Sequence, residues 1–193
     1  MTRVRLRVNG KAVVDDVPPR LSLADFLRER RNLTGTHLGC EHGVCGACTI
    51  LLDGEPVRSC LAFAVACDER DVTTIEGFAD DRIMAVLRRA FHQHHGLQCG
   101  FCTPAMLITA RDLIRRNRAG SEKEIRKELA GNICRCTGYT NIVTAISAAA
   151  ATLAGGEDTD VGAALQRVLT EIDEIAEATL RSISVETMLK SRR

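Results

Sequence analysis

The amino-acid sequence predicts an α+β protein, in which a small β-sheet domain is followed by a bundle of short helices and one further C-terminal helix. Three observations lead to this fold class. Residues 3–8 alternate between charged and apolar, which is the period of a half-buried strand. From Asp80 onward, apolar residues recur three and four positions apart, which is the period of a helix. Closely spaced cysteines occur in both regions, so each region carries a candidate metal site.

The N-terminal region begins with a predicted hairpin. After the alternating strand at residues 3–8, Asn9-Gly10 is a strong turn signal, and residues 12–14 can pair back onto the first strand. Pro18-Pro19 ends the second strand, because proline cannot donate to a ladder. Ser22 then caps a helix that covers the sheet with one apolar face, which consists of Leu23, Phe26 and Leu27.

Further strands complete this domain. Residues 49–52 form an apolar strand, Asp53-Gly54 turns the chain, and residues 57–58 can return just after Pro56. An apolar segment at 61–66 and a last strand at 72–74 close a small β-grasp-like unit. We therefore place the first domain at residues 1–77.

Four amphipathic segments follow. The first carries Ile83, Val86, Leu87, Ala90 and Phe91 on one face, and the second spans about 103–117 with Pro104 in its first turn. The third begins at Ser121, with Glu124 completing a capping box, and the fourth is an alanine-rich segment at about 141–153. Four short helices predict a four-helix bundle, which we place at residues 78–156.

The first cysteine group has a specific spacing. Cys40, Cys45, Cys48 and Cys60 follow the order C-x4-C-x2-C…C, which is that of plant-type [2Fe-2S] ligation. Three thiolates within nine residues require a loop that folds back tightly, and Gly39, Gly43 and Gly46 allow its backbone to approach the cluster sulfurs. A zinc site or two disulfides would explain neither the spacing nor the glycines. The total of nine cysteines also prevents complete pairing within the chain.

A second group lies at the turns between the predicted helices. Cys99 and Cys102 precede the second helix, and Cys134 and Cys136 lie between the third and the fourth. Thiolates at helix N-termini are stabilised by backbone N–H groups and the helix dipole, so these four could hold a second [2Fe-2S] cluster. The same four thiols could also bind zinc, and the spacing alone leaves both possibilities open.

Composition excludes several other functions. The 26 basic residues nearly balance the 25 acidic ones, and aromatic residues make up only 3% of the chain, which argues against nucleic acid as a partner. The N-terminus has no apolar signal region, and no apolar run is long enough to span a membrane. We therefore expect a cytoplasmic protein, in which clustered cysteines indicate metal ligation or redox chemistry.

Three motifs together resemble the iron–sulfur subunit of the molybdenum hydroxylase (xanthine dehydrogenase) family. They are the segments 39–49 (GCEHGVCGACT), 98–104 (QCGFCTP) and 131–139 (GNICRCTGY). The resemblance covers about residues 3–154 and is greatest to the separate-chain small subunits, such as those of carbon monoxide dehydrogenase, nicotinate dehydrogenase, quinoline oxidoreductase and 4-hydroxybenzoyl-CoA reductase. It implies a plant-type ferredoxin-like domain and a helical domain with one [2Fe-2S] cluster each.

The resemblance also implies partners and roles. The cluster of Cys99, Cys102, Cys134 and Cys136 would lie next to the molybdopterin of a large subunit, with Gln98 and Cys136 against the pterin. The cluster of the Cys40 loop would face the FAD of a medium subunit, or a cytochrome. This chain would then be the electron-transfer subunit of a hetero-oligomeric oxidoreductase with no catalytic residue of its own, since substrate choice belongs to the large subunit. The alternatives are a free-standing ferredoxin-like carrier, a subunit of an aldehyde dehydrogenase complex with a cytochrome acceptor, or a zinc scaffold.

The remaining features have simpler interpretations. Cys67 matches no ligand position, and we expect a buried thiol that packs as a small apolar side chain. His92, His94 and His95 are expected at a solvated helix end. Residues 157–193 extend beyond the usual end of such subunits, and Leu165, Val168, Ile172 and Ile175 recur there at helical spacing. We predict a helical extension from Asp160 to about Leu189 that docks on a partner subunit through this stripe.

Overall fold

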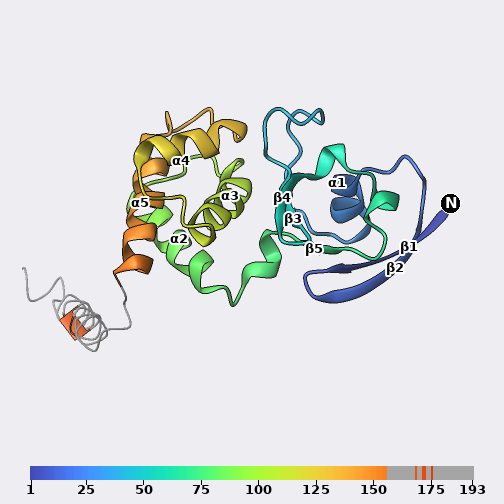
Figure 1. The fold of residues 1–193 in the computed structure, drawn as a ribbon, viewed down its shortest axis with the longest axis horizontal. Helices are drawn as coiled ribbons and strands as arrows, with labels where there is room; N and C mark the ends of the chain where they lie inside the picture. The colour runs from blue at the N-terminus through green and yellow to red at the C-terminus, as the bar shows by residue number, and fades with distance from the viewer. Residues whose placement is uncertain (156–167, 169–170, 173–174, 176–193) are drawn as a thin grey trace, which may run out of the picture. The chain divides into compact units, whose positions relative to one another are not determined.

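The structure is a computed structural model that describes residues 1–155 together with residues 168, 171, 172 and 175. Residues 1–151 form one compact unit, and a second unit begins at Thr152. The predicted extension at 157–193 lies mostly outside the described residues. Its described members Val168, Glu171, Ile172 and Ile175 are helical. In the first unit the strands precede most of the helices along the chain (Figure 1).

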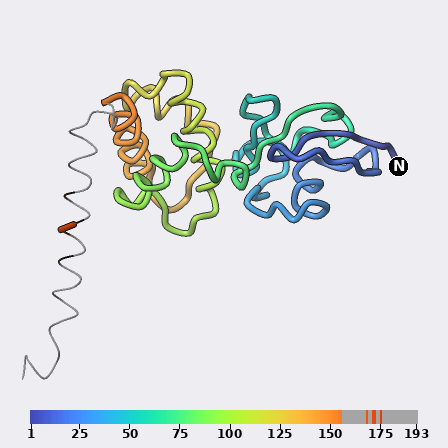
Figure 2. Tube along the Cα trace, turned by 90° about the horizontal axis from the view of Figure 1, so that it is seen from below, coloured from blue at the N-terminus to red at the C-terminus, as the bar shows by residue number. Residues whose placement is uncertain are grey.

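The sheet has five strands in the order β2-β1-β5-β3-β4. Strand β1 pairs in parallel with β5, whereas the other neighbours are antiparallel, so the sheet is mixed as the α+β prediction requires. Figure 2 shows β1 and β2 side by side close to the N-terminus. The bounds of the strands are β1 Thr2–Val8, β2 Lys11–Val17, β3 Thr49–Leu52, β4 Glu55–Arg58 and β5 Asp71–Thr73.

Strands β2 and β4 are longer than predicted. The hairpin turn is confirmed, because Asn9 and Gly10 both have positive φ, as a two-residue turn of this kind needs. Strand β2 pairs over more residues than the expected 12–14, and it ends at the fully buried Val17, directly before Pro18-Pro19 as predicted. Strand β4 includes Pro56, opposite Leu51, instead of starting after it. An edge strand tolerates proline because the missing N–H faces away from the ladder.

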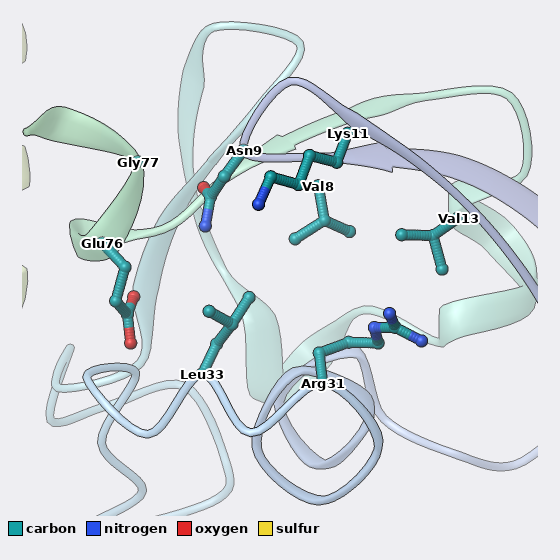
Figure 3. Close-up of a pocket in the computed structure, with 8 residues that line it drawn as sticks. All are labelled: Val8, Asn9, Lys11, Val13, Arg31, Leu33, Glu76 and Gly77. Atoms are coloured by element: carbon teal, nitrogen blue, oxygen red, sulfur yellow. The ribbon is translucent and has the colours of Figure 1, made fainter.

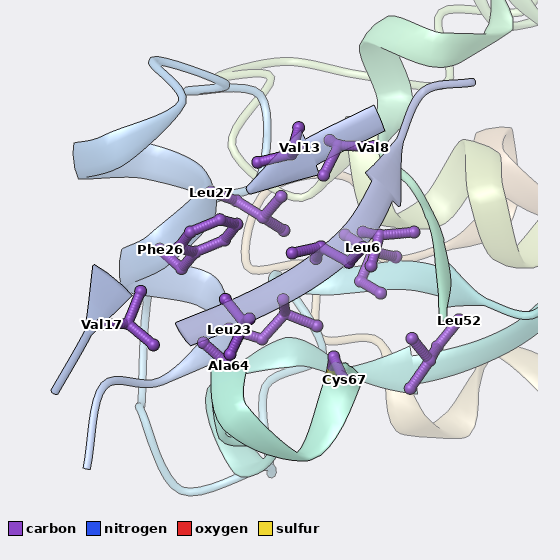
Figure 4. Close-up of a cluster of buried hydrophobic side chains, with 13 residues drawn as sticks. Leu6, Val8, Val13, Val17, Leu23, Phe26, Leu27, Leu52, Ala64 and Cys67 are labelled. Carbon is purple, nitrogen blue, oxygen red and sulfur yellow. The ribbon is translucent and has the colours of Figure 1, made fainter. Parts of the chain in front are cut away.

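The apolar core of the sheet domain forms as predicted. Ser22 Oγ accepts the Asp25 N–H at 3.0 Å and caps helix α1 (Leu23–Asp25), which continues as one π-helical turn over Phe26–Arg30. The side chains of Leu23, Phe26 and Leu27 are completely buried against the sheet (Figure 4). The Cys67 thiol is buried in the same core, which confirms its predicted packing role, and burial raises its pKa.

Four helices follow in the described chain. They are α2 (Arg82–Gln93), α3 (Thr103–Arg115), α4 (Glu122–Glu128) and α5 (Thr140–Ala154). The predicted caps are present, because Pro104 lies in the first turn of α3 and Ser121 Oγ accepts the Glu124 N–H at 3.3 Å. Helix α5 ends just before Gly155, as expected. Four helices are thus confirmed, while their arrangement as a four-helix bundle stays a prediction.

The buried faces of these helices largely follow the predicted stripes. In α2, the side chains of Leu87 and Phe91 are buried, but Met84 is fully buried where Ile83 was expected to be. Asp81 caps α2 by accepting the Met84 N–H at 2.8 Å, which fixes the start of the helix. None of the helices in the described part of the chain has the length and apolarity to cross a membrane.

A cavity of about 460 Å³ opens beside the hairpin and contains none of the cysteines. Figure 3 shows the side chains of Lys11 and Leu33 extending toward its interior. Its walls come from the hairpin, the end of the π-helical turn and the segment after β5, and consist of Val8, Asn9, Lys11, Val13, Arg31, Leu33, Glu76 and Gly77. The candidate chemistry therefore lies elsewhere, in the cysteine loops.

Candidate iron–sulfur centres

The first cysteine group is assembled from one loop and the turn after β4. Cys40, Cys45 and Cys48 lie in the loop before β3, and Cys60 lies in a 3₁₀ turn, Ser59–Leu61. All four thiols are free. The hydroxyl and N–H of Ser59 both donate to the Cys48 carbonyl, which holds the turn against the loop. The Cys48 thiol consequently lies beside Cys60, whose pKa is raised to about 11, first by burial and then by Cys48.

Backbone donors surround the Cys40 sulfur. The Cys45 N–H donates to Cys40 Sγ at 3.3 Å, and the N–H groups of His42 and Val44 add to it. These donors lower the pKa of Cys40 to about 6, with the Cys45 N–H as the largest cause. Such donors favour the thiolate, which is the form that ligates iron.

The three glycines of this loop exclude a side chain for different reasons. A Cβ at Gly39 would lie 3.3 Å from Cys45 Sγ, as expected for a backbone that approaches sulfur. A Cβ at Gly43 would instead meet the Leu61 side chain at 2.5 Å, and one at Gly46 would lie 2.2 Å from the Gly131 carbonyl oxygen. Gly43 and Gly46 also have positive φ. Gly39 therefore lies against a cysteine sulfur as expected, whereas the close neighbours of Gly43 and Gly46 are the Leu61 side chain and the backbone of the helical domain.

The second cysteine group lies at two turns of the helical domain. Cys102 is the N-cap residue of α3, with Cys99 three residues before it. Cys134 and Cys136 lie in the turn ahead of α5, which begins at Thr140. Cys136 Sγ and Cys99 Sγ are 3.5 Å apart, and the thiols of Cys102 and Cys134 are hydrogen-bond partners. The structure thus brings all four predicted residues together as free thiols.

Polar groups tune the individual thiols of this group. The Phe101 N–H lowers the pKa of Cys99. Burial acts to raise the pKa of Cys134, but hydrogen bonds, first from the Thr137 hydroxyl at 3.2 Å, lower it overall. Burial raises the pKa of Cys102 to about 12. Acidity therefore does not follow exposure in this group, because the pKa is lowered at exposed Cys99 and at buried Cys134 but raised at exposed Cys136.

Gln98 lies at the exposed side of the second group. Its Nε2 donates to the Cys136 backbone carbonyl at 3.1 Å, and no hydrogen bond from its side chain to a sulfur is present among the described residues. The predicted residue therefore contacts the group through the backbone of Cys136, which leaves the cysteine sulfurs free for metal.

Direct contacts join the two cysteine groups. The Ile133 N–H donates to the Cys45 carbonyl at 2.8 Å, so the residue before Cys134 is bonded to a cysteine of the first group. The His37 ring stacks on Phe101 with centroids 4.8 Å apart, and His37 Nδ1 lies 2.7 Å from the Phe101 carbonyl oxygen. Each loop thus contacts the other through backbone and ring atoms.

Within the described ranges, no three His, Cys, Asp or Glu side chains converge on a position where one ion could be held. His92 and His95 are exposed at the end of α2, as predicted. Four sulfurs that bind two iron atoms are spread farther apart than four sulfurs that surround one zinc ion in a tetrahedron. Each group offers four cysteine thiols, which is the donor set that a [2Fe-2S] cluster takes.

Comparison with known proteins identifies the chain. Residues 6–78 match the model of a 2Fe-2S iron-sulfur cluster binding domain, and residues 74–147 match that of a [2Fe-2S] binding domain. The chain is 51% identical over 152 residues to the caffeine dehydrogenase subunit gamma of Pseudomonas sp. (strain CBB1), covering 77% of this chain and 91% of that subunit. It is 48% identical over 143 residues to the nicotine 6-hydroxylase small subunit of Paenarthrobacter nicotinovorans, covering 74% and 86%. The chain belongs to the iron–sulfur small subunits of the molybdenum hydroxylase (xanthine dehydrogenase) family.

A solved structure supports the same conclusion. The small subunit matches a chain of quinoline 2-oxidoreductase from Pseudomonas putida 86 with a TM-score of 0.74 and 49% identity. The match covers 81% of the small subunit and 98% of that chain. The small subunit is accordingly an electron-transfer component with two [2Fe-2S] binding domains, and substrate chemistry takes place in other chains of its complex.

Apolar side chains surround both cysteine groups of the small subunit. Val44 and Leu61 are exposed beside the first group, and Leu97, Phe101 and Ile133 are exposed beside the second. Apolar residues of this size gathered around a polar site are typical of surfaces that bind another protein. These two apolar rims, Val44 with Leu61 and Leu97 with Phe101 and Ile133, could not be predicted, because the exposure of a single apolar residue near a cysteine leaves no pattern in the sequence.

Proposed function

We propose that Cys40, Cys45, Cys48 and Cys60 hold one [2Fe-2S] cluster, and that Cys99, Cys102, Cys134 and Cys136 hold the second. When bound, each cluster accepts and releases one electron. The domain bounds that go with this proposal are residues 1–77 for the first cluster and 78–156 for the second. The observation that carries the proposal is that the free thiols of each group lie against one another, as Cys48 does against Cys60 and Cys99 against Cys136. The 2.8 Å hydrogen bond between the Ile133 N–H and the Cys45 carbonyl then links the two groups by a short chain of bonds.

The chain's own groups prepare both sites. Three backbone N–H groups around Cys40 and the Thr137 hydroxyl at Cys134 stabilise thiolates. Hydrogen bonds to sulfur also raise the reduction potential of a cluster, because they favour the more negative reduced state. In the second group Cys134 is buried whereas Cys99 and Cys136 are exposed, so its cluster would have one side toward the core and one toward the surface; in the first group Cys48 is buried and the other three cysteines are half-buried.

Electrons would enter through the second group and leave through the first. The family resemblance assigns the second group to the molybdopterin of a large subunit, and Gln98 and Cys136 lie at its exposed side. The rim of Leu97, Phe101 and Ile133 offers a docking surface for that subunit. The rim of Val44 and Leu61 would face a medium subunit with FAD, or a cytochrome.

The wider setting follows from the same assignment. The relatives' names include caffeine, nicotine and quinoline, which are nitrogen heterocycles, but the substrate of this complex is chosen by its large subunit. The mixed charge and the nine free thiols fit a cytoplasmic hetero-oligomer that binds no nucleic acid and inserts no segment into a membrane. A free-standing carrier is the second candidate, and the identity of co-purifying chains separates the two.

The test is electron paramagnetic resonance of the reduced protein, with iron and acid-labile sulfide measured on the same sample. Four irons and two distinct signals are expected. Cys45→Ser should remove one signal and Cys102→Ser the other, whereas Cys67→Ser, which changes a buried core thiol, should keep both. A folded Cys45→Ser protein without either signal, or zinc in place of iron, would refute the assignment.

A further inference from the structure

The residues that join the two cysteine loops are polar and largely buried. Thr49 begins β3 one residue after Cys48, Arg58 ends β4, and Asn132 lies two residues before Cys134. Thr49 and Asn132 are each only 2% exposed. With Thr109 of α3, these residues form a single hydrogen-bonded network, which we call the polar clamp.

Asn132 is the central residue of the polar clamp. Its Nδ2 donates to the Gly46 carbonyl at 3.2 Å, and thus to the middle of the first cysteine loop. The same nitrogen lies 3.4 Å from Thr49 Oγ1, and its Oδ1 accepts the Thr109 hydroxyl at 3.1 Å. The Asn132 amide therefore spans the sheet domain and α3.

Thr49 and Arg58 close the network. The Thr49 hydroxyl donates to the Gly46 carbonyl at 2.6 Å and accepts from Arg58 Nη1 and Asn132, so its one donor and two lone pairs are all used. Arg58 Nη2 donates to the Gly131 carbonyl, next to Asn132. Buried networks in which every group is paired fix one geometry, because any displacement leaves a buried group unpaired.

We infer that the polar clamp sets the separation and orientation of the two clusters, with Asn132 as a positioning residue for electron transfer between them. The inference rests on the two clusters proposed above. Neither Asn132 nor Thr109 is a ligand of the proposed clusters. The clamp acts by holding Gly46 and Gly131 in contact. The Ile133–Cys45 hydrogen bond, one residue along the chain from Asn132, then stays formed.

The contacts of the clamp suggest a graded set of variants. Thr109→Val removes only the hydroxyl that orients the amide, at constant shape and without touching either loop. Thr109→Ser restores that hydroxyl. Asn132→Ala removes the whole bridge. Asn141→Ala is the matched control, because Asn141 is an exposed asparagine whose amide bonds to the His95 carbonyl, outside the clamp.

Two measurements report on cluster placement instead of turnover. In the fully reduced subunit, magnetic interaction between the two clusters splits their resonance lines, and the splitting falls steeply with distance. Hydrogen exchange followed by mass spectrometry reports the protection of the segment that contains the Ile133 N–H. We expect Asn132→Ala and Thr109→Val to reduce the splitting and to lose protection at this segment, while Thr109→Ser and Asn141→Ala match the unchanged protein.

The outcomes separate this inference from the function on which it rests. Iron content and the two individual signals should be unchanged in Thr109→Val, because no ligand is altered. If folded Thr109→Val and Asn132→Ala proteins both show the splitting and the protection of the unchanged protein, the clamp does not position the clusters. The assignment of the two clusters would stand. Absence of a second signal in the unchanged protein would instead refute the proposed function. Hydrogen exchange at Ile133 would then decide the clamp, with unaltered protection in both variants refuting it.

Discussion

Replacing Gly46 by alanine is the sharpest test of how closely the two cysteine loops approach each other. Gly46 has φ near +74°, and a Cβ there would lie 2.2 Å from the Gly131 carbonyl oxygen and 3.0 Å from Asn132 Cα. Both neighbours are backbone atoms of the helical domain, so they cannot move aside as a flexible side chain would. The substitution therefore strains the local backbone and also forces the loops apart.

The magnitude follows from these two effects. An alanine in the left-handed region costs about 1–2 kcal/mol. Overpacking at a tight contact costs a further ~1–3 kcal/mol. Gly54→Ala is the matched control, because Gly54 has φ near +84° in the β3–β4 turn but no atom within 4 Å of an added Cβ. The control should show the backbone cost alone, so the difference between the two variants isolates the contact between the loops.

Thermal unfolding followed by far-ultraviolet circular dichroism measures this difference. For a chain of this size, each kcal/mol lowers the melting temperature by about 2–4 °C. Gly46→Ala should therefore melt lower than Gly54→Ala by about 2–12 °C, at one heating rate because unfolding with loss of iron is irreversible. Equal melting temperatures for the two variants would show that the loops do not meet at Gly46, and the reasoning would fail.

Three further predictions follow from other parts of the chain. Gln98→Ala should keep both clusters but slow their reduction by substrate in the assembled complex, because the side chain that positions the Cys136 backbone is lost; single-turnover mixing checks this, and an unchanged rate would contradict it. Burial acts to raise the pKa of Asp81, but the Arg111 guanidinium and the Met84 N–H lower it overall, so the carboxylate stabilises the folded chain at neutral pH. Asp81→Ala should lower the melting temperature near pH 7 by about 1–8 °C at one heating rate, from a loss of about 0.5–2 kcal/mol, and an unchanged melting temperature would contradict this. Truncation after Gly156 should leave both clusters intact but weaken assembly, by about 1.5–3 kcal/mol of binding free energy for each Leu, Ile or Val that the partner buries. Size-exclusion chromatography of the complex measures this effect. Equally tight assembly, together with a lower melting temperature of the lone subunit, would show that the extension packs on its own chain.

The local elements could be predicted because their signals lie within a few residues of each other. The Asn9-Gly10 turn, the Ser22 and Ser121 caps and Pro104 each act on atoms of the same turn. The stop of β2 before Pro18-Pro19 was predicted, but its pairing beyond residue 14 was not, because Asp15 and Asp16 interrupt the apolar alternation before Val17, whose burial is decided by the tertiary core. Propensity and pattern give way to packing at such positions.

The cysteine groups could also be predicted, since ligand spacing is a local property. The polar clamp could not. Gly46 and Asn132 are 86 positions apart, and nothing in the sequence indicates that the Asn132 amide reaches the Gly46 carbonyl. Arg58 follows a proline and a valine in a short edge strand and looks like an ordinary solvated side chain, although it donates to the Gly131 carbonyl. Long-range hydrogen bonds of this kind leave no periodic signal.

The polar clamp gives a structural role to motif residues other than the cysteines. Gly131 stands next to Asn132, and a Cβ at Gly131 would lie 2.5 Å from Arg58 Nη2, so the glycine makes room for a side chain of the sheet domain. Gly46, between Cys45 and Cys48, in turn makes room for the Gly131 carbonyl. Each motif therefore contains cysteines that we propose as cluster ligands and residues that fit the other motif. In the proposed relay an electron would cross from one loop to the other, so the second kind of residue would govern transfer as directly as the ligands govern cluster binding.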